Sequence, residues 1–294
     1  MGVSPTFCIT QRRSILNILQ AILMGIVQGL TEFLPVSSSG HLAIFRAILN
    51  VNTEVSALFE ALLHVGTLAA VFIVFWKDVK MLIIETLKLI RDAFLWIVKK
   101  QKIEIYTERM LSLLVIVASI PTAIIGLIVE IFLEDFLLSS LVAVGVGLLI
   151  TGGLLLLMTK IPQGHKELKD MKLRDGIFMG LVQGIATVPG ISRSGSTVTA
   201  GLFCGLDRDF AFRFSFLMSI PAILGATLLK LLKISATDAA NVGSYLIGMV
   251  IAGVIGYFSL IWMRKLLKNW KFHYFGFYDL AIGLIVIVFG IFVH

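Results

Sequence analysis

A polar stretch inside lipid-like sequence constrains this chain more than any other feature. Residues 28–41 read Gln-Gly-Leu-Thr-Glu-Phe-Leu-Pro-Val-Ser-Ser-Ser-Gly-His. A carboxylate such as that of Glu32 costs about 2.5 to 3.5 kcal/mol near a bilayer centre, so an ionisable residue there is by default a functional candidate. Pro35 disfavours helix at Leu34, and the serines after it can cap a new helix that starts near Gly40. We therefore predict two half-helices joined by an irregular turn that faces protein or water.

The same stretch occurs a second time, 155 positions later and without a gap. Gln183 takes the place of Gln28, and the run Ser192-Arg193-Ser194-Gly195 takes the place of Ser37-Ser38-Ser39-Gly40. Three differences between the copies change the chemistry. Glu32 corresponds to Thr187, His41 to Ser196 and Ser38 to Arg193. One copy therefore carries an acid and an imidazole, and the other carries a guanidinium.

The remaining sequence is that of a polytopic membrane protein. Of the 294 residues, 58% are hydrophobic and only 15% are charged, which lies far outside soluble globular composition. Six apolar runs are long enough to cross a bilayer, and they cover residues 57–76, 110–132, 137–158, 210–232, 243–264 and 277–293. We expect an all-α protein with six transmembrane helices.

Three of these runs follow each copy of the motif, which predicts an inverted repeat. An odd number of crossings gives the two halves opposite orientations and brings a site to the membrane midplane. We expect one membrane domain over 1–294, with repeats at about 15–158 and 173–293. The motif hairpins, at about 15–49 and 173–205, should then re-enter from opposite faces and meet. Residues 15–34 are also long enough to span once, so that alternative stays open for the first hairpin.

The positive charge supports this topology. Of the 25 Lys and Arg, 17 lie in the connections 77–109, 159–174 and 264–276, which should therefore be cytoplasmic. This pattern explains the net charge of +7, and we expect no nucleic-acid partner. Residues 81–100 mix apolar and charged positions and predict an amphipathic helix on the membrane surface.

The second copy has the composition of an anion site. Arg193 places a fixed charge among hydroxyls just before a helix whose first N–H groups are free, a combination that favours phosphate or carboxylate. The residues expected to contact such a substrate are Gln28, Ser37, Ser39, Ser192, Ser194 and Gly195. The alternative is that Arg193 serves only as the ion-pair partner of Glu32.

Two residues of the first copy are candidate nucleophiles. If the second half-helix begins near Ser38, His41 shares its face, and the imidazole could activate the hydroxyl or attack itself. The alternative is that His41 is a polar helix contact. Glu60 and His64 are also one turn apart, but we interpret them as packing residues of a spanning helix.

The sequence offers no protein-only metal cage, because it has no Asp/Glu cluster or His pair of sufficient density. A divalent cation, Mg²⁺ or Ca²⁺, shared between Glu32 and substrate phosphates is compatible with the residues.

The two motifs, at residues 28–41 and 189–197, resemble those of the bacterial undecaprenyl-diphosphate phosphatases, the bacitracin-resistance family. The resemblance covers the chain from about residue 15. It implies a multi-pass enzyme of the bacterial plasma membrane that removes the terminal phosphate of undecaprenyl diphosphate, recycles the lipid carrier for peptidoglycan synthesis and depends on a divalent cation. It implicates Glu32, Ser38, His41 and Arg193 in catalysis. Gln28 stands where many members have a second Glu, which weakens any expectation of paired carboxylate ligands.

Other functions also fit the architecture. Opposed broken helices are typical of transporters, so a secondary transporter or flippase of an anionic lipid phosphate is the main alternative. An intramembrane serine protease is a more distant one. A transporter needs the anion clamp but no nucleophile beside a base, so Ser38 and His41 favour the phosphatase. The expected partners are a polyprenyl diphosphate lipid and the bilayer, and we also consider a homodimer.

Overall fold

The computed structural model describes residues 17–49, 57–100, 104–232, 236–269 and 271–292. Within these ranges the chain forms twelve α-helices and one 3-10 turn, and no β-strand. The helices are α1 (Ile18–Thr31), α2 (Ser38–Ile48), α3 (Ala57–Val74), α4 (Trp76–Lys99), α5 (Thr107–Phe132), α6 (Glu134–Ser139), α7 (Leu141–Met158), α8 (Leu173–Ile185), α9 (Arg193–Phe203), α10 (Arg208–Leu231), α11 (Ala236–Asn269) and α12 (His273–Phe292). The predicted all-α class is confirmed. The outermost repeat boundaries, at 15 and 293, lie outside the described residues.

Among the described residues, six helices are long and apolar enough to cross a bilayer, which agrees with the six predicted spans. They are α3, α5, α7, α10, α11 and α12. The third span begins at Leu141, and not at residue 137 as expected. The reason is a local cap: the Ser140 hydroxyl accepts a hydrogen bond from the Ala143 N–H at 3.3 Å and starts a new helix there.

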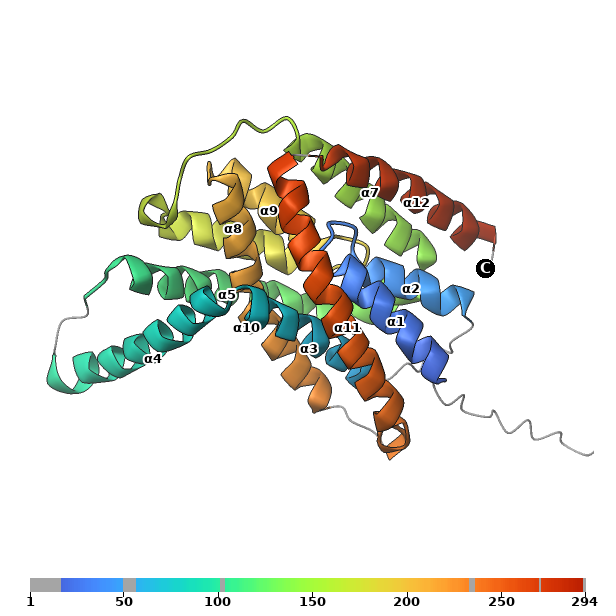
Figure 1. Ribbon diagram of the computed structural model, residues 1–294, viewed down its shortest axis with the longest axis horizontal. Coiled ribbons are helices and arrows are strands. Elements are labelled where there is room, and N and C mark those ends of the chain that lie inside the picture. Colours follow the sequence, from blue (N-terminus) through green and yellow to red (C-terminus); the bar gives the residue numbers. More distant parts are fainter. Residues whose placement is uncertain (1–16, 50–56, 101–103, 233–235, 270, 293–294) are drawn as a thin grey trace, which may run out of the picture.

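The helices pack reciprocally between the two halves of the chain. α1 packs along α11, α8 packs along α5, and α7 packs along α12 (Figure 1). The helix that opens each motif copy therefore lies against a spanning helix of the other half. This exchange brings the two copies into the same part of the molecule.

Both predicted hairpins are present as helix pairs with the same spacing. α1 and α8 begin at Ile18 and Leu173, and α2 and α9 begin at Ser38 and Arg193, so both starts keep the offset of 155 residues. α2 begins two residues before the expected start near Gly40, because Ser37 is its N-cap. That each hairpin enters and leaves at one face of the bilayer stays a prediction.

Equivalent glycines allow the motif helices to approach their neighbours. A Cβ atom at Gly29 would lie 2.8 Å from the Ala252 carbonyl oxygen of α11, and one at Gly184 would lie 2.7 Å from the Ile125 Cβ of α5. Any larger residue would push these helices apart. The glycines thus fix how close each motif helix lies to the opposite half.

The amphipathic segment predicted at 81–100 is part of α4, which starts earlier, at Trp76. Arg109 of α5 contacts Asp92 at 3.0 Å and Glu85 at 3.8 Å, so two acidic residues of the helix are paired with the neighbouring spanning helix. On the other side an exposed apolar stripe runs along the helix and consists of Ile83, Leu87, Ile90, Phe94 and Ile97. Such a stripe suits a helix that lies at a membrane surface.

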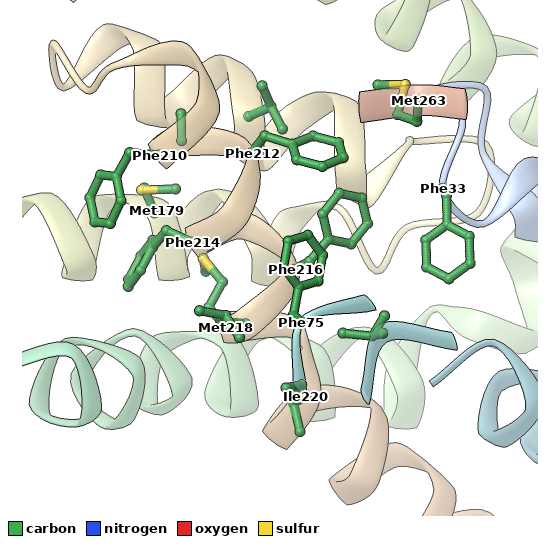
Figure 2. Close-up of a cluster of buried hydrophobic side chains, with 14 of the residues drawn as sticks. Phe33, Phe75, Met179, Phe210, Phe212, Phe214, Phe216, Met218, Ile220 and Met263 are labelled. Carbon is green, nitrogen blue, oxygen red and sulfur yellow. The ribbon is translucent and has the colours of Figure 1, made fainter. Parts of the chain in front are cut away.

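A cluster of buried aromatic side chains holds the first motif turn in place. Phe33 directly follows Glu32 and is 1% exposed. Its ring centroid lies 5.6 Å from that of Phe216 in α10, which in turn packs on Phe212 and Phe75 (Figure 2). Burying a phenylalanine contributes about 1.5 to 3 kcal/mol. This anchor therefore positions the carboxylate next to it.

Candidate active site

The first motif copy breaks its helix with a tight turn. α1 ends at Thr31, and α2 starts after Ser37, whose φ of 66° lies in the left-handed region that non-glycine residues rarely adopt. The Ser37 hydroxyl accepts a hydrogen bond from the Gly40 N–H at 3.3 Å. The strained residue thus caps α2 and places the next side chain, Ser38, at the very start of the helix.

The second copy reaches a similar result with different residues. Gly190 supplies the positive φ, at 88°, and the Ser192 hydroxyl accepts a hydrogen bond from the Gly195 N–H at 3.1 Å. Ser192 is thereby the N-cap of α9, and Arg193 is its first residue. The first backbone N–H groups of both helices lack intrahelical partners. Each copy therefore presents a helix N-terminus beside a functional side chain.

Glu32 is the point at which the two copies meet. Its carboxylate accepts hydrogen bonds from the Ser38 hydroxyl at 2.7 Å and from the Gln28 amide at 3.0 Å. The Arg193 guanidinium forms an ion pair with the other carboxylate oxygen. The Glu32 side chain is only 2% exposed and that of Arg193 is 19% exposed. A serine, a carboxylate and an arginine that are far apart in the sequence thus form one buried cluster.

This cluster lies on the wall of a cleft of about 580 Å³. Six of the predicted site residues line it, and they are Glu32, Ser37, Ser38, Ser39, Ser192 and Arg193. Most of the lining that comes from α5 and α10 is apolar, for example Leu127 and Ile223, and its charged members are Glu130 and Lys230. The cleft therefore joins a charged end to a surface suited to a hydrocarbon chain.

Three predicted site residues lie behind this wall. Gln28 is buried and is bonded to Glu32, so it orients the carboxylate. The Ser194 hydroxyl bonds with that of Ser192 at 3.2 Å. The Gly195 N–H is used in the cap of α9. Their predicted contact with substrate stays untested, while their structural role is clear.

His41 does not face the Ser38 hydroxyl. Its Nδ1 lies 2.9 Å from the Ser37 carbonyl oxygen, and its Nε2 lies 2.8 Å from the Tyr278 hydroxyl of α12. Because a carbonyl oxygen only accepts, Nδ1 carries the proton, and Nε2 accepts from Tyr278. In this arrangement His41 supports the turn that presents Ser38. Its predicted role as base or nucleophile stays a prediction.

The imidazole that lines the cleft is instead that of His64. Its Nδ1 bonds with the Glu60 carbonyl oxygen at 2.9 Å, and its Nε2 lies 3.7 Å from a carboxylate oxygen of Glu32. Glu60 also lines the cleft. Glu60 makes the ion pairs to Arg46 and Lys230 that a packing residue of a spanning helix would make, but both side chains also line the cleft, which the interpretation as packing residues did not predict. Their one-turn spacing on a spanning helix was the signal in the sequence.

The residues around Glu32 could hold a divalent cation only together with ligands from the substrate. Among the described residues, no three His, Cys, Asp or Glu side chains cluster closely enough to hold a metal ion. Glu32 offers one carboxylate, whose oxygens already contact Arg193, Ser38 and Gln28. Any cation here would need most of its ligands from phosphate oxygens and water.

Comparison with known proteins gives consistent matches over nearly the whole chain. Residues 21–285 match the family described as bacitracin resistance protein BacA. A protein of Alkaliphilus metalliredigens named undecaprenyl-diphosphatase is 43% identical over 278 residues, which cover 92% of this chain and 98% of that protein. Proteins with the same name from Methanosphaera stadtmanae and Halothermothrix orenii are 39% and 41% identical, covering 94% and 93% of this chain and 99% and 98% of their own lengths.

Proposed function

The chain belongs to the bacitracin resistance protein BacA family, and from this premise we propose that its cleft hydrolyses undecaprenyl diphosphate to undecaprenyl phosphate and inorganic phosphate. It is an integral membrane phosphatase with six spanning helices. The product is the lipid carrier used in peptidoglycan synthesis, and its recycling accounts for bacitracin resistance in such a family.

One observation carries this proposal more than any other. Ser38 and Arg193 come from opposite copies of the motif, and both contact the Glu32 carboxylate within one cleft. Phosphoryl transfer requires a nucleophile placed in line with the leaving oxygen and positive charge around the equatorial oxygens. Arg193 and the N-termini of α2 and α9 supply that charge, while Ser38 supplies an activated oxygen.

In the proposed reaction the Ser38 oxygen attacks the terminal phosphorus, and its proton passes to Glu32. The bond from that phosphorus to the bridging oxygen breaks, and the lipid monophosphate leaves with the bridging oxygen. Water then attacks the phosphoserine and the bond from phosphorus to the Ser38 oxygen breaks. Glu32 returns its proton to that oxygen, and the proton lost by the water leaves with inorganic phosphate. Glu32 is suited to take the proton because the Ser38 hydroxyl already donates to it at 2.7 Å.

A divalent cation, Mg²⁺ or Ca²⁺, is proposed as the cofactor. Glu32 would be its protein ligand, and the substrate phosphates would complete its coordination. When bound, such a cation neutralises charge on the transferred phosphoryl group. The shared arrangement is supported by the absence, among the described residues, of a cluster of three His, Cys, Asp or Glu side chains around Glu32.

The membrane location and orientation of the enzyme are proposed from its apolar helices and basic connections. We propose the bacterial plasma membrane as its location, with the basic connections at 77–109, 159–174 and 264–276 on the cytoplasmic side. The two hairpins would re-enter from opposite faces, which would place the Glu32 cluster near the midplane. The homodimer considered from the sequence stays a prediction.

Release of phosphate in detergent tests the proposal against transport. The purified protein should release inorganic phosphate from a polyprenyl diphosphate in micelles, where no gradient exists. A transporter of lipid phosphates would release none under these conditions but would move a labelled lipid across proteoliposome membranes. The absence of phosphate release at any Mg²⁺ or Ca²⁺ concentration would count against the phosphatase.

A further inference from the structure

A second charged cluster lies in the same cleft as Glu32 and Arg193. Its centre is Glu60, in the first turn of α3, which forms ion pairs with Arg46 of α2 and, at 3.0 Å, with Lys230 of α10. The three side chains are 13 to 18% exposed. All three line the cleft.

The second cluster is a neighbour of the first along one wall. Glu60 and His64 are one turn apart on α3, a rise of about 5.4 Å. The His64 ring links them, because its Nδ1 bonds with the Glu60 carbonyl oxygen at 2.9 Å and its Nε2 lies 3.7 Å from Glu32. Arg46 and Lys230 pair with the Glu60 carboxylate, so the two clusters share the α3 side of one cleft.

The proposed substrate carries negative charge on two phosphates. Hydrolysis at the terminal phosphorus leaves a phosphate on the lipid, and that group also carries negative charge. In a cleft with apolar walls, a charge without a partner has a large desolvation cost. Arg193 already contacts Glu32 and is assigned to the terminal phosphate. The other Lys and Arg side chains among the described residues that line the cleft are Arg46 and Lys230.

We infer that Arg46 and Lys230 form a subsite for the phosphate that stays on the lipid, and that Glu60 pairs with both cations until substrate binds. This inference rests on the proposed function. The arginine can bind two phosphate oxygens at once, and the lysine acts as a compact point charge. Glu60 is their counterion in the absence of substrate. When substrate binds, its phosphate takes the place of the Glu60 carboxylate as the partner of the two cations.

Substitutions in the cluster distinguish a phosphate-binding role from a purely structural role of its ion pairs. Arg46→Gln and Lys230→Gln should each raise KM about tenfold, which corresponds to the loss of one charged hydrogen bond, and should change kcat far less. Glu60→Gln keeps both cations and removes the carboxylate that competes with the substrate for them, so KM should fall. If the cluster only ties α2, α3 and α10 together, Glu60→Gln should be as damaging as the other two, and this result would overturn the inference.

Controls keep the comparison independent of folding. Arg174→Gln removes a 75% exposed arginine from another part of the surface and should leave KM unchanged. Thermal unfolding in detergent should be recorded for every variant. A variant that unfolds early is replaced by Arg46→Lys or Lys230→Arg, which keep the charge. Lys230→Arg should keep KM within a few-fold of the wild type, and Arg46→Lys should raise KM less than Arg46→Gln does, because it keeps the charge but loses the two-oxygen contact. A conservative variant as poor as its glutamine counterpart would contradict the assignment.

Equilibrium binding identifies which phosphate is held and needs no turnover. Farnesyl phosphate, a short lipid monophosphate, and inorganic phosphate should be titrated against the wild type and against Arg46→Gln and Lys230→Gln. The inference predicts about tenfold weaker binding of farnesyl phosphate and unchanged binding of inorganic phosphate. The reverse pattern, or no change for either probe, would overturn it. If the wild type binds farnesyl phosphate but releases no phosphate from the diphosphate, the proposed function fails while the subsite stands.

Discussion

At the scale of single residues, Arg193 should affect the reaction most. Arg193→Ala removes the guanidinium that contacts Glu32 and is assigned to the terminal phosphate. Loss of transition-state charge stabilisation of this kind costs about 100-fold to 1,000-fold in kcat. Arg193→Lys keeps the charge but not the two-pronged geometry, so it should rescue poorly. Phosphate release in detergent measures both effects, and a fully active lysine variant would contradict a two-oxygen contact.

Glu32 has two proposed roles that respond differently to added cation. Glu32→Gln has nearly the same shape and can still meet Gln28 and Ser38, so the variant should fold and elute as a single species. Its activity should be very low, because the amide cannot take the proton of Ser38. Titration with Mg²⁺ or Ca²⁺ then separates the roles. Recovery of rate at high concentration indicates a cation ligand, and no recovery at any concentration supports proton transfer.

Some of the site could be predicted from residue types alone, and some could not. Glu32 and Arg193 stand out because charge in lipid-like sequence needs a reason. The contact between His41 and Tyr278 joins residues 237 positions apart, and it depends on how α2 packs near α12. The position of His64 depends likewise on which face of α3 turns to the cleft. The spacing of Glu60 and His64 places them on one face of α3, but it does not tell whether that face packs against another helix or lines a cleft.

At the scale of helices, close approach of α1 to α11 should depend on Gly29. Gly29→Leu would place side-chain atoms against the Ala252 carbonyl, 2.8 Å from the Cβ position, and should lower the free energy of unfolding by about 1 to 3 kcal/mol. Activity should fall as well, because Glu32 directly follows α1. Gly153→Leu in α7 is the matched control, since nothing lies within 4 Å of its Cβ position. Equal unfolding temperatures for the two variants would contradict this packing.

Helix number and type could be read from the sequence because the apolar runs are long. The six spans and the equal spacing of the two hairpins follow from hydropathy and from the duplication. The predicted starts of α2 and α7 were less accurate, because Ser37 and Ser140 cap these helices through single hydrogen bonds. Several serines in a row can each serve as a cap. The sequence therefore locates such an end only to within a few residues.

At the scale of the whole molecule, orientation follows from the positions of the basic connections. Single cysteines should be introduced at Lys169, in the basic connection 159–174, and at Phe136, in the short helix α6 between the spanning helices α5 and α7, in a variant that lacks the native cysteines. Both side chains are largely exposed. A membrane-impermeant maleimide should label Phe136→Cys in intact cells and Lys169→Cys only after permeabilisation. Labelling of both positions from outside would contradict the topology.

The central claim is that the two motif copies form one phosphoryl-transfer centre in which Ser38 attacks. A single-turnover reaction with substrate labelled at the terminal phosphate, quenched in acid and in alkali, tests it most directly. We expect a transient label on Ser38 that survives acid but not alkali, followed by release of phosphate. Ser38→Ala should show neither the adduct nor the release. An acid-labile label on His41, or a normal burst of phosphate from Ser38→Ala, would contradict the claim.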